Sequence, residues 1–342
     1  PSSKRPKLTS PGDNDDINVA HPSLFERLPK ELFWQIIEFA PNTVFLLRST
    51  SHSIQTQVDE FALQPSTILL VKSLKFTGST IEMAVDENCT NLFELRLNRL
   101  LREFCGDNPL TKGQNYYFET VYRMVSDSPD PEDDMLELLR CIGRRVSEMR
   151  IANSNTFSLT CISKIIENVQ ISELDIEDSN LSDTTADFIS EVARENYVKQ
   201  LYMRVFKVSV SDPVNFMLNL SSFITGLYLY QGHVYDIDQA RSYLFGVFDA
   251  DWSTIILKMF SKKLETIHIQ NNNHPEYLSL NDTNALINEL PKGEKKILFR
   301  ASCNKYPDGV YQTKDEYSIR ADNDNSEYPY LQINHDSRQI DL

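Results

Sequence analysis

The residue types that most often carry catalysis are scattered along this sequence. Its six histidines and five cysteines form no Cys-x-x-Cys or His-x-x-x-His pair that could hold a metal ion. None of the histidines lies in a motif with a serine or cysteine nucleophile. The chain has 10 glycines and no glycine-rich phosphate loop. We therefore predict no catalytic residues, no metal and no cofactor. An enzyme whose site is assembled from residues far apart in the sequence stays a remote alternative.

Tyrosine, arginine and other polar residues are instead spaced as they would be on a binding surface. They occupy the middle of short apolar-x-apolar segments, which predict strands whose middle residue points away from the core. If such strands lie side by side, the middle residues form an exposed column of Lys75, Arg96, Arg150, Asp175, Tyr202, Tyr228 and His268. A neighbouring column would hold Glu177, Arg204, Tyr230 and Gln270.

These columns predict contact with another protein. Tyrosine and arginine are enriched at the hot spots of protein interfaces. The alternative interpretation is that tyrosine suits exposed strands in any protein. The residues that we predict to bind a protein substrate are Arg150, Asp175, Tyr202, Arg204, Tyr228, Tyr230 and His268.

The segments that would carry these columns recur at nearly regular intervals. Those that begin at Met149, Leu174, Leu201 and Leu227 are 25, 27 and 26 residues apart, and helix-like stretches lie between them, for example at 158–169 and 184–195. This period, with its apolar-x-apolar strands, resembles an irregular leucine-rich repeat over about residues 66–305. The resemblance implies a solenoid of strand–helix repeats. Similar segments begin at Leu74, Leu95 and Ile267.

Three features depart from the leucine-rich-repeat pattern. The asparagine that usually follows the strand is not always present, 40 residues separate Leu227 from Ile267, and an acidic loop at 126–134 interrupts the series. An α/β domain in which strands and helices simply alternate is the alternative. After the repeats, alternating apolar residues on both sides of a turn-rich centre predict a β-hairpin at 316–335.

Residues 24–63 predict two short helices. Pro29 suits the first turn of a helix, Pro41 ends that helix, and Asn42 can cap the next one. Both helices carry apolar residues at helical spacing. Two short helices cannot cover all of these side chains, so some pack either on the rest of the chain or on a partner. The large residues in question include Phe33, Trp34 and Phe45.

The same segment resembles an F-box of the form found in large nematode families. The resemblance rests on Leu-Pro-x-Glu-Leu-x-x-x-Ile at 28–36 and on Val-x-x-Leu-Arg-x-Thr-Ser at 44–51. That family docks onto the Skp-family adaptor of a cullin-based SCF ubiquitin ligase. The positions that match the family's adaptor contacts are Leu28, Pro29, Leu32, Ile36, Val44 and Leu47.

The resemblance implies a non-catalytic substrate-recognition subunit of an SCF-type ubiquitin ligase. Its expected partners are a Skp-family adaptor, a cullin reached through that adaptor, and a protein substrate. The alternative is a repeat-based protein that binds or sequesters its partner without any ligase.

Composition argues against several other kinds of partner. Among 342 residues there are 34 Lys and Arg against 49 Asp and Glu, which gives a formal charge of −15. Such a surface repels nucleic acid and anionic membranes, and no apolar run is long enough to span a bilayer. Scattered cysteines are typical of a reduced compartment. We expect a cytoplasmic protein, which is also nuclear if Lys4-Arg5-Pro6-Lys7 is an import signal.

The expected fold class is α/β, in three parts. Residues 1–22 are a polar tail that we predict to be disordered. Residues 23–65 form the F-box-like helical module, and residues 66–342 form the leucine-rich-repeat-like, substrate-binding domain.

Overall fold

The structure is a computed structural model. It describes residues 24–63, 71–103, 110–114, 119–125, 143–178, 180–205, 209–231, 252–271, 289, 298–302, 309–312, 317–322 and 330–335. The chain divides into two compact units, Pro1–Phe61 and Ala62–Leu342, called below the helical unit and the sheet unit. The predicted tail at 1–22 and the acidic loop at 126–134 lie outside the described residues.

Short helices make up the helical unit. They are η1 (Phe25–Arg27), α1 (Lys30–Phe39), η2 (Pro41–Thr43), α2 (Val44–Arg48) and α3 (His52–Leu63). The carbonyl of Pro29 accepts the first hydrogen bonds of α1, and the helix ends just before Pro41, as predicted. Asn42 does not cap the next helix, because it lies within η2 and Thr43 is the residue before α2.

Local hydrogen bonds divide the second predicted helix into α2 and α3. The hydroxyls of Ser49 and Thr50 each donate to the backbone carbonyl three residues earlier, at 2.7 Å. Such bonds offer the backbone an alternative to the helix. Ser51 Oγ then accepts from the N–H of Ile54 at 3.3 Å, which caps the start of α3, and it donates to Glu26 Oε1 at 2.6 Å.

Ion pairs and aromatic contacts hold the helices of this unit together. Arg48 Nε lies 2.8 Å from Asp59 Oδ1, and Arg48 Nη2 lies 3.4 Å from Asp59 Oδ2. Because Asp59 is buried, this two-pronged pair compensates the removal of its carboxylate from water. Between α1 and α3, the rings of Trp34 and Phe61 lie 6.0 Å apart, and Lys30 Nζ lies 4.7 Å from the Trp34 ring.

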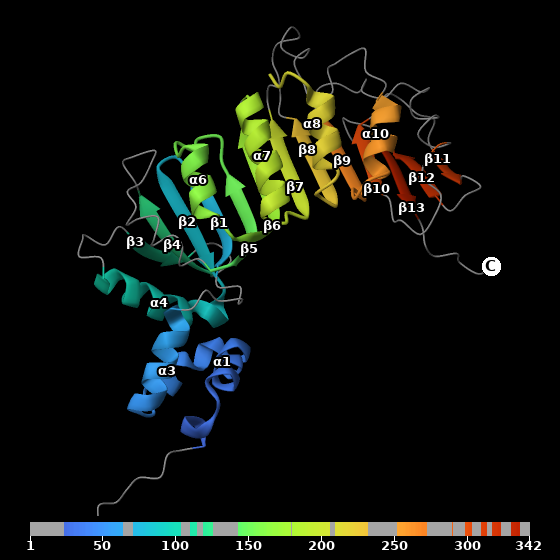
Figure 1. The fold of residues 1–342 in the computed structure, drawn as a ribbon. Coiled ribbons are helices and arrows are strands. Elements are labelled where there is room, and N and C mark those ends of the chain that lie inside the picture. The colour runs from blue at the N-terminus through green and yellow to red at the C-terminus, as the bar shows by residue number, and fades with distance from the viewer. Residues whose placement is uncertain are drawn as a thin grey trace, which may run out of the picture. The chain divides into compact units, whose positions relative to one another are not determined.

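The sheet unit contains a sheet of thirteen strands among the described residues (Figure 1). Their order across the sheet is β11-β12-β13-β10-β9-β8-β7-β6-β5-β1-β2-β4-β3. The strands are β1 (Val71–Thr77), β2 (Thr80–Val85), β3 (Leu110–Gln114), β4 (Thr120–Val125), β5 (Arg145–Ile151), β6 (Gln170–Asp178), β7 (Gln200–Val205), β8 (Gly226–Gln231), β9 (Thr266–Asn271), β10 (Leu298–Ser302), β11 (Gly309–Gln312), β12 (Tyr317–Asp322) and β13 (Tyr330–His335).

Parallel strands form the middle of the sheet, and antiparallel strands form its two ends. Every neighbouring pair from β1 through β5, β6, β7, β8 and β9 to β10 is parallel. At one end β2, β4 and β3 add on in antiparallel fashion, and at the other β13, β12 and β11 do the same. The antiparallel pair of β12 and β13 is the hairpin predicted at 316–335.

Helices follow one another along one face of the parallel strands (Figure 1). They are α6 (Leu159–Ile165), α7 (Asp183–Glu195), α8 (Pro213–Leu220) and α10 (Trp252–Phe260); η3 (Glu87–Cys89) and α4 (Thr90–Glu103) come earlier in the chain. Three of these helices begin with a side-chain cap, from Ser158, Ser182 and Asp212 respectively. Helices α6 and α7 occur where the sequence predicts helices.

The apolar residues of the apolar-x-apolar segments form the core between the helices and the sheet. All of those in β5 to β8 are buried: Met149, Ile151, Leu174, Ile176, Leu201, Met203, Leu227 and Leu229. Neighbouring strand–helix units are also joined by Asn196, which is buried and donates to the carbonyls of Ile166 (2.8 Å) and Val169 (2.7 Å). The sequence pattern did not single out this asparagine.

One predicted strand is wrong. Leu95 and Leu97 lie in α4, and Arg96 is buried there at 4% exposure, so Arg96 is not part of the exposed column. Two apolar residues two apart fit a helix as well as a strand when Leu92 and Phe93 supply the helical spacing. The neighbour of β5 is β1, which carries Lys75.

Candidate binding surfaces

The apolar residues of α1 fall into two sets. Phe33 and Ile37 are completely buried, whereas Leu32 is 48%, Ile36 36% and Phe39 94% exposed. Residues four apart lie on the same side of a helix, so Leu32 with Ile36 and Phe33 with Ile37 define two different sides. The second pair fills the core, and the first pair is left at the surface.

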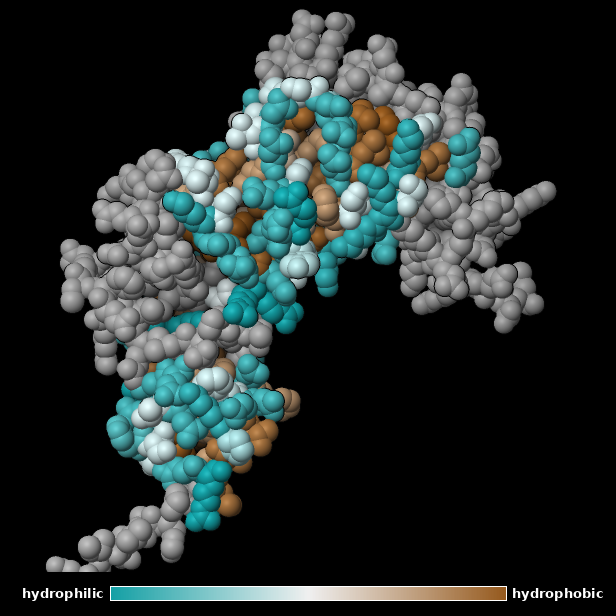
Figure 2. Space-filling model, viewed as in Figure 1, coloured by the Kyte–Doolittle hydropathy of each residue, from teal (hydrophilic) through white to brown (hydrophobic). Residues whose placement is uncertain are grey.

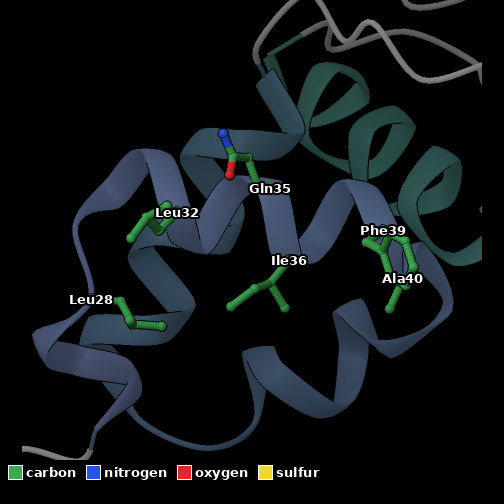
Figure 3. Close-up of a pocket in the computed structure, with 6 residues that line it drawn as sticks. All are labelled: Leu28, Leu32, Gln35, Ile36, Phe39 and Ala40. Carbon is green, nitrogen blue, oxygen red and sulfur yellow. The ribbon is translucent and has the colours of Figure 1, made fainter.

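The exposed set lines an apolar hollow of about 500 Å³ (Figure 3). Figure 3 shows Leu28, Leu32 and Ile36 around one part of the hollow, and Phe39 with Ala40 at its other end. Gln35 completes the lining. In Figure 2 hydrophobic residues of the helical unit are visible at its surface. Four further large apolar residues are exposed there, namely Leu24, Phe25, Phe45 and Leu46. Exposed apolar surface is typical of interaction sites, so the hollow is a candidate docking surface.

The predicted adaptor-binding residues do not all lie at this surface. Pro29, Leu32 and Ile36 are exposed, and Leu28 and Leu47 are half-buried. Val44 is completely buried. The prediction that Val44 contacts an adaptor is therefore corrected, because its side chain lies in the core of the helical unit.

The structure also separates buried from exposed residues among the large apolar side chains that the sequence left unassigned. Phe33 is core, and Phe45 is exposed. Trp34 is half-buried against Phe61 and Lys30. Of the three, only Phe45 has a side chain free for a partner.

On the sheet unit, strand pairing aligns the predicted columns residue by residue. Strand register places Lys75, Arg150, Asp175, Tyr202, Tyr228 and His268 side by side, and Arg300 of β10 follows His268. This set is called the central row. The second column, Glu177, Arg204, Tyr230 and Gln270, is likewise in register. Both rows lie on the face opposite the helix-covered core, because they alternate with the buried residues.

A third row, missed from the sequence, runs along the other side of the central row. It consists of Glu148, Glu173, Gln200 and Gly226, which are paired in register, and it is called the acidic row. Its residues lie two positions before those of the central row, outside the apolar-x-apolar segments that drew attention to the other columns. Only the continued alternation of the strands could have found it.

An ionic cluster occupies the start of the central row. Asp175 is only 5% exposed, with Arg204 Nη2 at 3.0 Å and Arg150 Nε at 3.6 Å from its Oδ2. Arg150 Nη2 also lies 2.9 Å from Glu177 Oε2. Burial raises the pKa of Asp175, and the charges of Arg204 and Arg150 oppose that rise. Asp175 was predicted as an exposed contact, but it lies beneath the surface, where it positions the two arginines.

Aromatic rings continue the central row beyond Asp175. The rings of Tyr202 and Tyr228 stack with centroids 4.4 Å apart and planes 11° from parallel. The His268 ring meets Tyr228 and Tyr230 edge-on, at 6.1 Å and 5.7 Å. Such stacked and edge-to-face pairs are the arrangements that aromatic rings prefer. The structure therefore brings together four of the predicted binding residues as one aromatic cluster.

The two stacked tyrosines lean toward the acidic row. The hydroxyl of Tyr202 donates to Gln200 Oε1 at 2.8 Å. A Cβ at Gly226 would lie 3.1 Å from a ring carbon of Tyr228 and 3.6 Å from its hydroxyl, so the missing side chain at Gly226 leaves room for this ring. Burial, followed by the charge of Glu173, raises the pKa of Tyr202 to about 12. The Tyr202 hydroxyl therefore keeps its proton at neutral pH.

Two glutamates stand side by side in the acidic row. Glu148 of β5 pairs in register with Glu173 of β6, and the described part of the chain supplies no ion pair to either carboxylate. Burial, together with the charge of Glu148, raises the pKa of Glu173. Lys72 is close enough for Glu148 to affect its pKa, but its hydrogen bond goes to Glu119. Among the described residues, neither glutamate therefore has an ion-pair partner of its own.

Comparisons with known proteins give the chain no relative. No family model, no curated protein and no solved structure matches it. Within the described ranges, no group of three or more His, Cys, Asp and Glu residues could hold a metal ion. None of the helices in those ranges has the length and apolar character that crossing a membrane requires.

Proposed function

We propose that this protein is the non-catalytic substrate-recognition subunit of an SCF-type ubiquitin ligase. The observation that carries the proposal is the apolar hollow on α1. Leu28, Leu32 and Ile36 line it, and all three belong to the Leu-Pro-x-Glu-Leu-x-x-x-Ile motif that resembles an F-box. An apolar helix face of this kind suits docking of a partner helix.

The polar half of the motif supports the same proposal. Arg48 pairs with the buried Asp59, and Ser51 caps α3 and bonds Glu26. These residues have internal partners, so they hold the unit in shape while the apolar residues face outward. An adaptor-docking module requires both polar residues with internal partners and apolar residues at its surface.

The sheet unit is the proposed substrate-binding part, an irregular leucine-rich-repeat-like solenoid. The equal spacing of its middle strands and the uninterrupted rows on one face support this assignment. Catalysis would be positional: the receptor holds substrate lysines within reach of a conjugating enzyme that other subunits bring.

The test is a double substitution, Leu32→Asp with Ile36→Asp. Both side chains are at least 36% exposed, so the charges are tolerated in the free protein. In a complex they would be buried in an apolar groove without partners, at a cost above the roughly 2–7 kcal/mol of an unpaired neutral polar group. We expect pull-down of a Skp-family adaptor to be lost while circular dichroism and thermal unfolding stay unchanged.

The matched control adds the same two charges elsewhere in the helical unit. Ser53 and Thr56 are exposed on α3, so Ser53→Asp with Thr56→Asp should leave adaptor capture intact. Normal adaptor capture by the Leu32 and Ile36 variant would reject the ligase assignment. Capture of a substrate by an unsubstituted protein that does not co-purify with a Skp-family adaptor and a cullin would favour the ligase-independent binder instead.

A further inference from the structure

The proposed function leaves open what the exposed sheet face recognises. Its side chains include both arginines and carboxylates, so the face could suit either an anionic or a cationic ligand. The contacts of each charged group decide between them.

Arg150 and Arg204 are already paired with carboxylates. Arg204 binds Asp175, and Arg150 binds both Asp175 and Glu177. An anionic ligand such as a phosphorylated peptide would have to compete with these carboxylates, one of which is buried. Electrostatic repulsion from Asp175 and Glu177 would add to that cost.

The carboxylates of the acidic row are in the opposite situation. Glu148 and Glu173 repel each other and have no ion pair among the described residues, and Glu173 is partly buried. A cation placed between them would relieve the repulsion and replace the water that burial has removed. Asp175 Oδ1 is a further acceptor without a hydrogen-bond partner in the described part of the chain.

The stacked tyrosines border these carboxylates. Tyr202 and Tyr228 lean toward the acidic row, and the Tyr228 ring lies over Gly226, where a side chain would crowd it. Aromatic rings attract ammonium and guanidinium groups and pack against the aliphatic parts of Lys and Arg. The rings and the carboxylates therefore favour the same type of ligand.

We propose that the exposed sheet face binds an arginine or lysine side chain in a basic segment of the partner protein, with Glu173 and Glu148 pairing with the cation and Tyr202 and Tyr228 contacting its aliphatic arm. This inference deepens the proposed function by naming the class of substrate. It rests on that function for the statement that the bound partner is a ubiquitination substrate. The charged residues of the acidic row are both glutamates, so charge complementarity at this row favours a basic partner. The net charge of −15 would speed its approach.

The test measures binding of short fluorescein-labelled peptides to the full chain by fluorescence anisotropy. The first peptide alternates arginine with glycine and serine. In the second, glutamate replaces each arginine, and in the third, phosphoserine does. We expect the arginine peptide alone to bind measurably.

Two variants remove the proposed contacts. Glu173→Gln keeps the size of the side chain and removes its charge, and Tyr228→Leu removes the aromatic ring. Each should weaken binding of the arginine peptide by about three- to tenfold, the range expected of cation–π and partly buried charge contacts. Tyr228→Phe keeps the ring and should bind within about twofold of the unsubstituted protein. Arg204 is avoided, because its removal would also take away the nearer of the two arginine partners of the buried Asp175.

Matched controls separate this site from general attraction to an acidic protein. Glu191 and Tyr197 are exposed, on α7 and just after it, so Glu191→Gln and Tyr197→Leu should leave binding unchanged. The proposal is overturned if Glu191→Gln weakens binding as much as Glu173→Gln, because the attraction would then be non-specific. It is equally overturned if no peptide binds, or if the phosphoserine peptide binds best.

Adaptor pull-down from the same samples distinguishes the two proposals. Peptide binding without adaptor capture would reject the ligase assignment and keep the basic-ligand site. Adaptor capture without peptide binding would reject the basic-ligand site and keep the ligase assignment.

Discussion

At the scale of residues, the exposed sheet face contains charges that are satisfied and charges that are not. Asp175 is buried but has two arginine partners, which is the condition under which a buried carboxylate is tolerated. Glu173 is partly buried beside Glu148 and has no such partner among the described residues. The second arrangement lowers stability unless a ligand compensates it.

Glu173 should therefore couple peptide binding to pH. Its pKa lies above the ordinary value of 4.5, and only the ionised carboxylate pairs with a cation. As the pH falls, affinity for the arginine peptide should begin to drop above pH 4.5, and this step should be absent in Glu173→Gln.

The same raised pKa fixes the sign of its effect on stability. The folded protein binds this proton more tightly than the unfolded chain, so the contribution of Glu173 to the free energy of unfolding is lost as the pH rises from 4.5 through the folded-state pKa. Glu173→Gln should accordingly not lower the free energy of unfolding at pH 7, measured by urea denaturation. A clear loss of stability there would mean that Glu173 has a structural partner.

At the scale of elements, strand alternation and spacing predicted much of the sheet. The faces of β5 to β9 followed from apolar residues two apart, and the register of β5 to β8 from their nearly equal intervals. The prediction that Arg96 lies on an exposed strand was wrong, because a two-residue spacing also fits a helix. Burial of Asp175 beneath Arg150 and Arg204 could not be predicted, since it depends on which long side chains cross between strands.

The helix that covers β6 and β7 gives a direct test of one element. Ser182 Oγ accepts from the N–H of Thr185 at 3.3 Å and thereby caps α7. Ser182→Ala should lower the free energy of unfolding by about 1 kcal/mol, and Ser182→Gly by a few tenths, because glycine is tolerated at this position. Urea denaturation measures both. Equal effects of alanine and glycine would show that the cap contributes little.

At the scale of the whole molecule, the two proposed surfaces belong to different compact units. The apolar hollow lies within Pro1–Phe61, and the rows lie within Ala62–Leu342. Neither surface draws a residue from the other unit. The middle of the sheet is continuous from β1 to β10, so the rows belong to one sheet.

The two surfaces should therefore act independently. Leu32→Asp with Ile36→Asp should leave affinity for the arginine peptide unchanged, and Tyr228→Leu should leave adaptor capture unchanged. Combining the two sets should add their effects within about 0.5 kcal/mol. Isothermal titration of each ligand, with and without the other present, measures this. A larger deviation would indicate coupling between the units.

The parallel arrangement of the middle strands has a consequence for how this protein could evolve. Strands β6, β7 and β8 each contribute one residue to every row. In solenoids of such repeats, each repeat packs against the repeats on either side. Duplication of one unit of about 26 residues would therefore lengthen all three rows by one position and leave the existing core intact. Deletion would shorten them in the same way. Recombination within the gene could thus alter the length of the proposed peptide-binding surface without changing the core or the apolar surface of α1.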